Sequence, residues 1–349
     1  SQLPEMKEVD RFVTAAGRTI YTFPTRAFPG LVANLFVIDD GQHQVLVDCG
    51  SGLDHNNEDL LAGLARVEEA YGRRVDLAQL DAILVTHGHI DHFGGLNFVR
   101  RFSQAPIGVH PLDRRVLSHY EERLVVASRY LERYLKSAGV TGQHLANLMS
   151  MYLFAKGVYR STPVQFALEE GVPLPADLGL EGIQVFHVPG HCPGQVCLLV
   201  DDILLTADHV LSRTTPHQAP ESITNNMGLG HYLASLARIE RLDGVRLALG
   251  GHEEPMADLP GRVQEIRELH DQRLNRVLEI CTEPKSIAQI SQELFGPVSS
   301  YHVLLALEET GAHLEYLYQR GEVLATNLEE IERQPEPVIA YQRCDGRGC

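Results

Sequence analysis

The chain has 349 residues, of which 44% are hydrophobic, so it can bury a large core and is long enough for one large and one small domain. Its 30 Lys and Arg face 46 Asp and Glu, and the formal net charge of −16 argues against general binding to nucleic acid. No stretch is apolar for long enough to span a membrane, the first residues lack a signal-peptide pattern, and the six cysteines are scattered, so we expect a cytoplasmic protein.

Strand patterns dominate the first eighty-five residues. Apolar positions alternate over 9–23 and 30–37, and a further apolar run ends at Asp48. A helix with one apolar face is predicted over 57–72, and a short apolar run over 81–85 then predicts a buried strand.

Three histidines and an aspartate follow that strand, in the segment Thr86-His87-Gly88-His89-Ile90-Asp91-His92. A glycine turn and an apolar helical pattern come next, so the segment is a loop between a strand and a helix, where scaffolds place functional side chains. His87 and His89 can turn their rings to one side of an extended loop, whereas Asp91 and His92 can face a second ion. Neutral imidazoles and carboxylates bind zinc and similar ions, so we predict a metal site here.

Three more polar side chains follow predicted strands downstream. A strand over 182–188 leads to Pro189-Gly190-His191, and a hairpin over 196–206 leads to Asp208. A strand over 245–249 leads to Gly250-Gly251-His252. Each of these side chains is therefore expected at a strand end, where it can join the histidine loop.

The segment THGHIDH resembles the T-H-x-H-x-D-H signature of the metallo-β-lactamase superfamily. Asp48, His191, Asp208 and His252 match the other motifs of that family in the family's order. The resemblance covers roughly residues 30–255, and it implies an α/β fold, a four-layered αββα sandwich.

The resemblance also implies a dinuclear metal centre. His87, His89 and His191 would hold one divalent ion, Asp91, His92 and His252 would hold a second, and Asp208 would bridge them. Zinc is the ion that we expect first, with iron or manganese as alternatives. A hydroxide shared by two such ions can attack a substrate without a serine or cysteine nucleophile, and Asp91 is the expected catalytic residue that orients the attacking water or takes its proton.

Several residues near these motifs are open to more than one interpretation. Ala207 stands where the family often has glycine, and Gly250 stands where it often has proline. Cys192 follows His191 directly and is expected to be a small buried residue rather than a reactive thiol. The remaining nearby histidines are expected to pack or to contact substrate, not to bind metal: His110, His209, His217 and His231.

The rest of the chain predicts helices. Residues 112–160 read as a helical insertion, which could pack, roof the active site or make a dimer contact. Three helices and a hairpin signal over 263–333 are similar to the winged-helix domain that several superfamily hydrolases carry, although this one has few basic residues. We therefore predict a catalytic domain over 1–262, a winged-helix-like domain over 263–333 and a flexible tail over 334–349.

The resemblance to the glyoxalase II-like branch implies hydrolysis of a small-molecule ester, thioester or lactone. One alternative is an endoribonuclease or phosphodiesterase of the winged-helix branch, which the acidic composition disfavours. A second is an iron-dependent oxidoreductase similar to the persulfide dioxygenases. The expected partner is a small-molecule substrate, without nucleic acid or membrane, and a homodimer is open.

Overall fold

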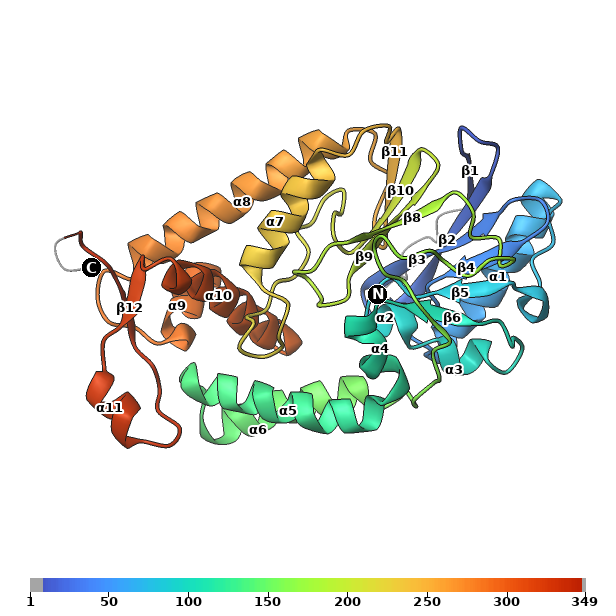
Figure 1. Cartoon of the computed structure of the whole chain (residues 1–349). Helices are drawn as coiled ribbons and strands as arrows, with labels where there is room; N and C mark the ends of the chain where they lie inside the picture. The colour runs from blue at the N-terminus through green and yellow to red at the C-terminus, as the bar shows by residue number, and fades with distance from the viewer. Residues whose placement is uncertain (1–8, 347–349) are drawn as a thin grey trace.

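Two β-sheets meet face to face because their strands carry apolar side chains on the sides that touch. In the computed structural model, which describes residues 9–346, Ile38, Val45 and Leu84 of one sheet are buried in a single cluster with Leu198 and Leu205 of the other. Figure 1 shows the two sheets side by side, with helices outside them.

The first sheet has seven strands in sequence order. They are β1 (Asp10–Val13), β2 (Thr19–Phe28), β3 (Leu31–Asp39), β4 (Gln44–Val47), β5 (Ala82–Leu84), β6 (Ile107–Val109) and β7 (Phe166–Ala167). Strands β1 to β4 are antiparallel, whereas β4 to β7 are parallel. All four residues of β4 are buried, as the apolar run before Asp48 predicts.

The second sheet has four strands in the order β11-β10-β9-β8. They are β8 (Ile183–His187), β9 (Val196–Val200), β10 (Ile203–Ala207) and β11 (Leu247–Gly250). Because β9 is antiparallel to β8 and β10, and β11 is parallel to β10, the last residues of β8, β10 and β11 lie at the same edge.

Helices cover the outer face of each sheet. The helix α1 (Asp54–Tyr71) buries Leu60, Leu64 and Val67 against the first sheet, and the single turn η1 (Leu77–Gln79) follows it. On the second sheet, α7 (Leu229–Glu240) and α8 (Leu259–Ile280) share a core with Leu204 and Ala248. This order of layers confirms the predicted αββα sandwich.

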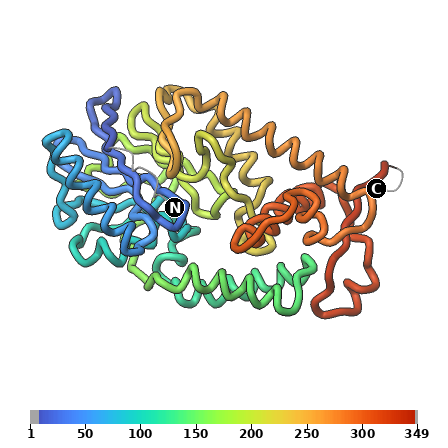
Figure 2. The backbone as a smooth tube through the Cα atoms, turned by 180° about the vertical axis from the view of Figure 1, so that it is seen from behind, coloured from blue at the N-terminus to red at the C-terminus, as the bar shows by residue number. Residues whose placement is uncertain are grey.

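The predicted insertion is helical and extends away from the sheets. It contains α4 (Pro111–Ser118), α5 (Tyr120–Ser137) and α6 (Gly142–Lys156). Figure 2 shows α5 and α6 side by side, running from the two-sheet core toward the C-terminal helices. The Tyr134 hydroxyl donates a hydrogen bond to the Leu307 carbonyl oxygen at 2.5 Å, so the insertion packs against the C-terminal helices.

The C-terminal segment follows α8 without a break. It contains α9 (Ile287–Phe295), α10 (Tyr301–Gln319), β12 (Val323–Ala325), α11 (Leu328–Arg333) and β13 (Tyr341–Arg343). Ser286 is the N-cap of α9, and Gln289 completes a capping box with it. The winged-helix assignment of this segment stays a prediction.

Two features of this segment differ from the expected domain limits. The helix α8 runs continuously across the boundary that we predicted after residue 262. Residues 341–343 belong to the expected flexible tail, yet they form β13 and pair with β12. The domain limits therefore stay a prediction, and residues 347–349 of that tail lie outside the described range.

Within residues 9–346, no helix combines the length and the apolar character that crossing a membrane requires.

Candidate metal centre

Strand ends position the seven side chains of the predicted metal site. His87 and His89 lie in the loop after β5, and His191, Asp208 and His252 lie in the loops after β8, β10 and β11. Asp91 and His92 belong to the short helix α2 (Ile90–Phe93), which α3 (Leu96–Val99) follows. Seven side chains from five segments of the sequence thus meet at one edge of the two sheets.

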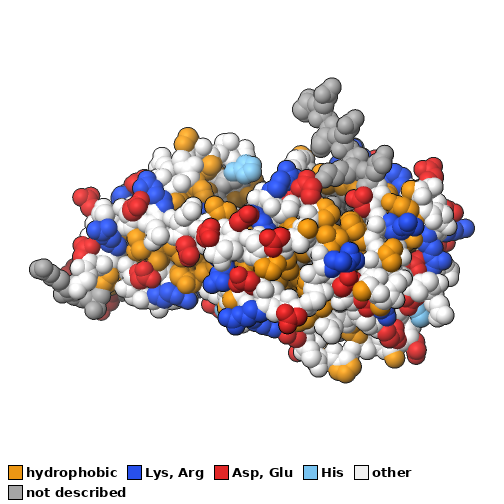
Figure 3. Space-filling model, turned by 90° about the horizontal axis from the view of Figure 1, so that it is seen from above, with side chains coloured by type: hydrophobic (Ala, Val, Ile, Leu, Met, Phe, Trp, Pro, Cys, Tyr) orange, Lys and Arg blue, Asp and Glu red, His pale blue; other side chains and the backbone are white. Residues whose placement is uncertain are grey.

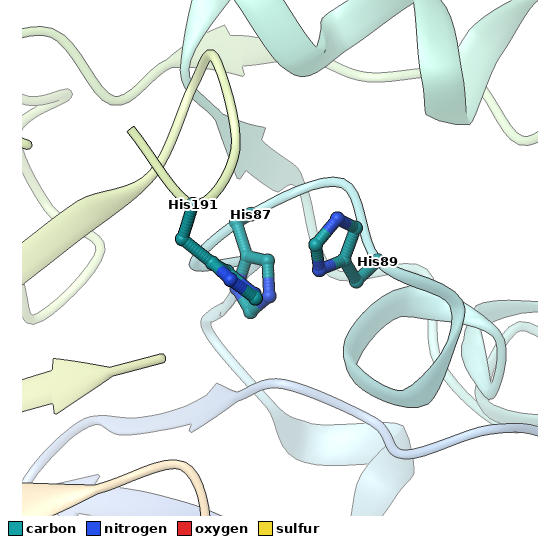
Figure 4. Close-up of side chains that lie close together, drawn as sticks. All are labelled: His87, His89 and His191. Carbon is teal, nitrogen blue, oxygen red and sulfur yellow. The ribbon is translucent and has the colours of Figure 1, made fainter. Parts of the chain in front are cut away.

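The first group contains His87, His89 and His191. One ring nitrogen of each lies within 4.8 Å of the others. Figure 4 shows His87 and His89 on one loop and His191 on a second loop, with the three rings gathered around a common space. This group has the composition of a three-histidine site.

The second group contains Asp91, His92, Asp208 and His252, and all four are buried. An Asp91 carboxylate oxygen lies 3.3 Å from His92 Nε2 and 3.2 Å from His252 Nε2. Asp208 Oδ2 lies 3.3 Å from each of the same two nitrogens.

Asp208 also touches the first group. Its Oδ2 is 3.7 Å from His87 Nε2 and 3.5 Å from His191 Nε2. One carboxylate therefore faces both histidine groups, which is the position that a bridging ligand needs.

Four of the histidines are oriented by hydrogen bonds from Nδ1. His92 donates to Asp48 Oδ2 at 2.9 Å, His191 to the His217 carbonyl oxygen at 2.7 Å, and His252 to the Val32 carbonyl oxygen at 2.6 Å. His87 Nδ1 lies 3.0 Å from the Thr86 hydroxyl, which itself donates to Asp48. These bonds fix the ring tautomers so that Nε2 is the free ligand atom.

The inward atoms of the site have no hydrogen-bond partner in the described part of the chain. They are His87 Nε2, His92 Nε2, His191 Nε2 and Asp208 Oδ1, and all four are buried. Leaving one buried polar group unsatisfied costs about 1–3 kcal/mol, so four together in a stable core call for a binding partner. A divalent cation satisfies such atoms, and the donor set fits one.

Metal ligation requires neutral imidazoles and ionised carboxylates, and burial and nearby charges favour these states for four of the seven side chains. Burial lowers the pKa of His87 and His89 well below the usual value, so both rings are neutral. Burial alone would raise the pKa of Asp208, but the nearby His92 and His252 lower it well below its usual value. The pKa of Asp91 falls for the same reason, chiefly through His92. Both carboxylates are thus ionised and able to bind cations.

The family model for the metallo-β-lactamase superfamily matches residues 29–252, which is more than half of the chain. The chain belongs to this superfamily. Its proteins bind divalent metal ions, and the two groups described above are the candidate ligand clusters.

Known proteins of similar sequence and structure agree with this assignment. The chain is 24% identical over 287 residues to the probable metallo-hydrolase YqjP of Bacillus subtilis, covering 79% of this chain and 85% of that protein. It is 23% identical over 281 residues to the atrochrysone carboxyl ACP thioesterase of Aspergillus fumigatus, covering 79% and 68%. A metallo-β-lactamase family protein from Thermus thermophilus superposes with a TM-score of 0.74 at 25% identity, covering 93% and 98%.

The structure explains a departure from the superfamily pattern. Ala207 has a φ of 48°, in the left-handed region that glycine adopts without strain, which accounts for the glycine that the family often has there. Gly251 cannot be larger, because a Cβ atom would lie 2.6 Å from Asp208 Oδ1 and 2.8 Å from His92 Cε1.

Asp48 supports the metal centre from below, as the superfamily motif implies. Its carboxylate accepts hydrogen bonds from the Thr86 backbone and hydroxyl at 2.8 Å each and from His92 Nδ1. It therefore orients His92 directly and His87 through Thr86.

Asp113, at the start of α4, is a residue that the superfamily motifs do not reveal. It is buried and accepts hydrogen bonds from the backbone N–H groups of Gly88 at 2.7 Å and Gly194 at 2.8 Å, and from the Cys192 thiol at 3.2 Å. It thus ties the His87–His89 loop to the His191 loop. Its only sequence signal is an aspartate four residues after a strand end.

Cys192 and the additional histidines have structural surroundings. Burial raises the pKa of the Cys192 thiol well above the usual value, which suits a buried residue rather than a nucleophile. His110 accepts a hydrogen bond from the Leu112 N–H and stacks on His187 with ring centres 3.9 Å apart. His209 is buried and packs on Tyr232.

His217 links the metal centre to the C-terminal helices. Its carbonyl oxygen holds His191, while its ring nitrogens lie 2.7 Å from Glu308 and 3.3 Å from Glu309, both on α10. Glu309 also accepts a hydrogen bond from the Gln218 N–H at 2.7 Å. Two carboxylates of α10 therefore support the loop that orients a candidate metal ligand.

A third group with metal-ligand composition lies between α8 and α10, formed by His270, Glu309 and His313. His313 Nδ1 donates to the Glu309 backbone oxygen at 2.7 Å, so His313 Nε2 is the acceptor for His270 Nδ1 at 3.0 Å. Arg273 pairs with the Glu309 carboxylate at 2.8 Å. Since an arginine already neutralises the carboxylate, we interpret this group as an interior hydrogen-bond network.

Proposed function

We propose that the protein is a dinuclear metal-dependent hydrolase that cleaves a small-molecule ester, thioester or lactone. His87, His89 and His191 hold one ion, Asp91, His92 and His252 hold the other, and Asp208 lies between them. The observation that carries this proposal is the set of buried inward atoms without partners, on imidazoles whose opposite nitrogens are already bonded.

Two bound divalent cations supply Lewis acidity, which polarises a carbonyl oxygen and makes water nucleophilic at neutral pH. The chain supports this chemistry with an ionised Asp91, whose carboxylate lies between His92 and His252 and can orient water or accept its proton. Cys192 is not needed as a nucleophile, because its thiol is buried and donates to Asp113.

An ester or thioester substrate is supported by the chemistry of the site and by the similar proteins. A bound divalent ion would polarise a carbonyl oxygen and make water nucleophilic at neutral pH, which are the two requirements of ester and thioester hydrolysis. One similar protein is named a metallo-hydrolase and another a thioesterase, each below 25% identity.

Cleavage of nucleic acid has less support. In a winged helix the recognition helix exposes one face to the groove, but most of α10 between Leu304 and Leu317 is buried. Acidic and basic side chains are interspersed over the face in Figure 3, without a continuous basic surface. The C-terminal helices support the His217 loop instead, which favours a structural role for them.

Zinc is the ion that we propose, and iron or manganese remain the alternatives because histidine and carboxylate suit all three. Elemental analysis of protein produced without added metal separates zinc from iron, and iron would favour the persulfide dioxygenase-like reaction. We also propose a homodimer, because the insertion exposes Val125, Phe154 and Val158. Sedimentation velocity tests it: a monomer at micromolar concentration would contradict it.

The activity test is turnover of a thioester, lactone and phosphodiester panel by the metal-loaded protein, by the protein after exhaustive chelation and by the His89→Ala variant. We expect thioester or lactone hydrolysis that chelation abolishes and metal restores. The exposed His55, which lies outside the site, provides the matched control His55→Ala. Equal rates before and after chelation would reject the proposal.

A further inference from the structure

The second sheet ends in an edge that no other strand covers. β8 is its last strand and pairs on one side only, with β9. The N–H of Ile183 points away from β9, because it donates to the Leu180 carbonyl oxygen at 3.2 Å. The N–H of His187 also points away from β9 and donates to the Glu170 carboxylate at 2.9 Å. Backbone groups alternate between the two sides of an antiparallel strand, so the N–H and C=O of Val185 face the same free edge.

The hydrogen bonds toward β9 agree with this alternation. The Gly182 carbonyl oxygen accepts from the Asp201 N–H at 3.2 Å, and the Val188 N–H donates to the Gln195 carbonyl oxygen at 2.8 Å. The even-numbered residues of this segment therefore bond within the sheet, and the odd-numbered residues face outward. No residue within 9–346 makes a hydrogen bond to the outward N–H or C=O of Val185.

A groove of about 660 Å³ lies along this edge. Residues 183–186 of β8 line one part of it, and residues within 169–182, the connection from β7 to β8, line the rest. Pro173 and Pro175 of this connection have no N–H, so the segment cannot form a regular ladder with β8. The other side chains of the connection that line the groove are mostly apolar, and Val172 is 49% exposed. An edge strand that is neither paired nor closely covered is a template for another extended chain.

The charge of the groove is negative. Its lining contains the exposed Glu169 and Glu181 and no lysine, arginine or histidine. Neither carboxylate makes an ion pair within residues 9–346, and the nearby Arg238 already pairs with Glu170 at 2.5 Å. A cationic side chain in the groove would therefore meet two carboxylates without counterions, and such complementarity selects between partners.

We propose that this groove binds an extended segment of a partner protein, which adds to β8 as a fifth strand and carries Lys or Arg side chains among apolar ones. The outward C=O of Ile183 and the N–H and C=O of Val185 provide the backbone hydrogen bonds. The apolar lining accepts alternate side chains, and Glu169 and Glu181 select the basic ones. The groove contains none of the seven candidate metal ligands, so this inference does not depend on the hydrolase function.

The test uses the full chain and the peptide Lys-Val-Lys-Val-Lys-Val, labelled with fluorescein at its N-terminus and amidated at its C-terminus. Fluorescence anisotropy measures binding, which should be saturable. The peptide Glu-Val-Glu-Val-Glu-Val should bind at least about tenfold more weakly, because its charges repel those of the groove.

Backbone methylation tests the strand geometry on the unchanged protein. In an added strand, alternate N–H groups face β8 and the others face away. N-methylation of all lysines and N-methylation of all valines therefore block opposite edges of the peptide. One of the two forms should bind about tenfold more weakly than the parent peptide, and the other should bind almost equally well.

Val185→Pro removes the outward N–H and no hydrogen bond to β9, so the strand should persist while the affinity for the basic peptide falls about tenfold. Val13→Pro is the matched control in β1, the edge strand of the first sheet. The N–H of Thr14 donates to the Arg18 carbonyl oxygen at 2.8 Å, so the N–H of Val13 before it faces outward, and its loss should leave the peptide affinity unchanged.

The double variant Glu169→Gln and Glu181→Gln should weaken binding of the basic peptide about fivefold or more at low salt, and by less at high salt. The exposed Glu69 of α1 gives the control Glu69→Gln. Circular dichroism should show folded protein for every variant. If Val185→Pro does not fold, the comparison of the two methylated peptides decides alone.

No binding of the basic peptide at about 1 mM, equal affinities for the two methylated forms, or an undiminished affinity in a folded Val185→Pro variant would overturn the proposal. Sedimentation velocity adds one further outcome. A dimer that Val185→Pro abolishes, in a protein that binds no peptide, would assign the edge to a second copy of this chain and reject the partner segment.

Discussion

The metal centre and the network around Glu309, between α8 and α10, differ in how far their buried polar atoms are paired. In the centre, four buried nitrogen and oxygen atoms point inward without partners, while the outer nitrogens of the rings are bonded. Between α8 and α10, the carboxylate of Glu309 is shared by Arg273, His217 and the Gln218 backbone. The unpaired atoms of the centre can therefore accept a cation, whereas the Glu309 carboxylate is already neutralised and stabilises the packing of the helices.

This difference indicates that the two sheets have one role and that the helical insertion and the C-terminal helices have another. Strand ends of two packed sheets supply the candidate ligands, because a close-packed core fixes their positions. The insertion and the C-terminal helices supply side chains that hold the ligand loops, namely Asp113, Glu308 and Glu309. Variants in the two regions should therefore fail differently, and the following predictions run from the largest expected effect to the smallest.

The largest effect is expected at the residue that faces both histidine groups. Asp208→Ala should lower kcat/KM by at least about 10³-fold, because the transition state loses several kcal/mol of metal-dependent stabilisation. Elemental analysis should show less bound metal, and circular dichroism should show a folded protein. The exposed Asp243 gives the matched control Asp243→Ala. Full activity in Asp208→Ala would show that this side chain, and with it the proposed metal centre, is not required for catalysis.

A smaller loss is expected where the insertion touches the centre. Asp113→Ala leaves the Gly88 and Gly194 N–H groups without their acceptor, so the free energy of unfolding should fall by about 3 kcal/mol. Metal affinity, measured by chelator competition, should fall about 10–100-fold because the two ligand loops are no longer tied together. Asp113→Asn retains one acceptor and should lose less. Unchanged metal affinity in both variants would show that the loops of His87, His89 and His191 keep their positions without Asp113.

The contribution of the Glu309 network to stability should depend on pH in the acid range. Burial works to raise the pKa of Glu309, but the nearby His217 lowers it to about 2, so the carboxylate stabilises the fold above pH 4.5 and this contribution is lost as pH falls toward 2. Glu309→Gln should lower the free energy of unfolding at pH 7 by about 2–3 kcal/mol and flatten its fall in acid.

Urea unfolding of both metal-free proteins from pH 3 to 7 measures this difference. Burial also lowers the pKa of His270, to about 3, so part of the acid sensitivity should persist in the variant. Parallel curves for the two proteins would show that the Glu309 carboxylate makes no net contribution.

The smallest effect is expected at Ala207. Glycine adopts a φ of 48° without the strain that alanine has there, but it also makes the unfolded chain more flexible. Ala207→Gly should therefore raise the free energy of unfolding by less than about 1 kcal/mol, which urea unfolding can detect. A loss of more than that amount would mean that the methyl group packs favourably.

The sequence is enough to propose the seven side chains of the centre as one group, because each stands in a short motif that follows an apolar strand. His87 and Asp91 can be recognised from neighbours in the same loop, and the structure brings all seven side chains together. The two-sheet fold follows from the same strand patterns.

Residues that support the centre could not be predicted, because tertiary contacts define their roles. Asp113 bonds to a glycine 25 positions earlier and another 81 positions later in the chain. The sequence predicts that His217 packs or contacts substrate, but its backbone oxygen, which any residue possesses, orients His191.

The position of α10 in the chain has a consequence for biosynthesis. All seven candidate ligands precede residue 253, whereas Glu308 and Glu309, which brace the loop behind His191, are translated more than fifty residues later. A nascent chain therefore exposes its candidate ligands before Glu308 and Glu309 have been translated, so the loop behind His191 gains its support only after α10 has been synthesised.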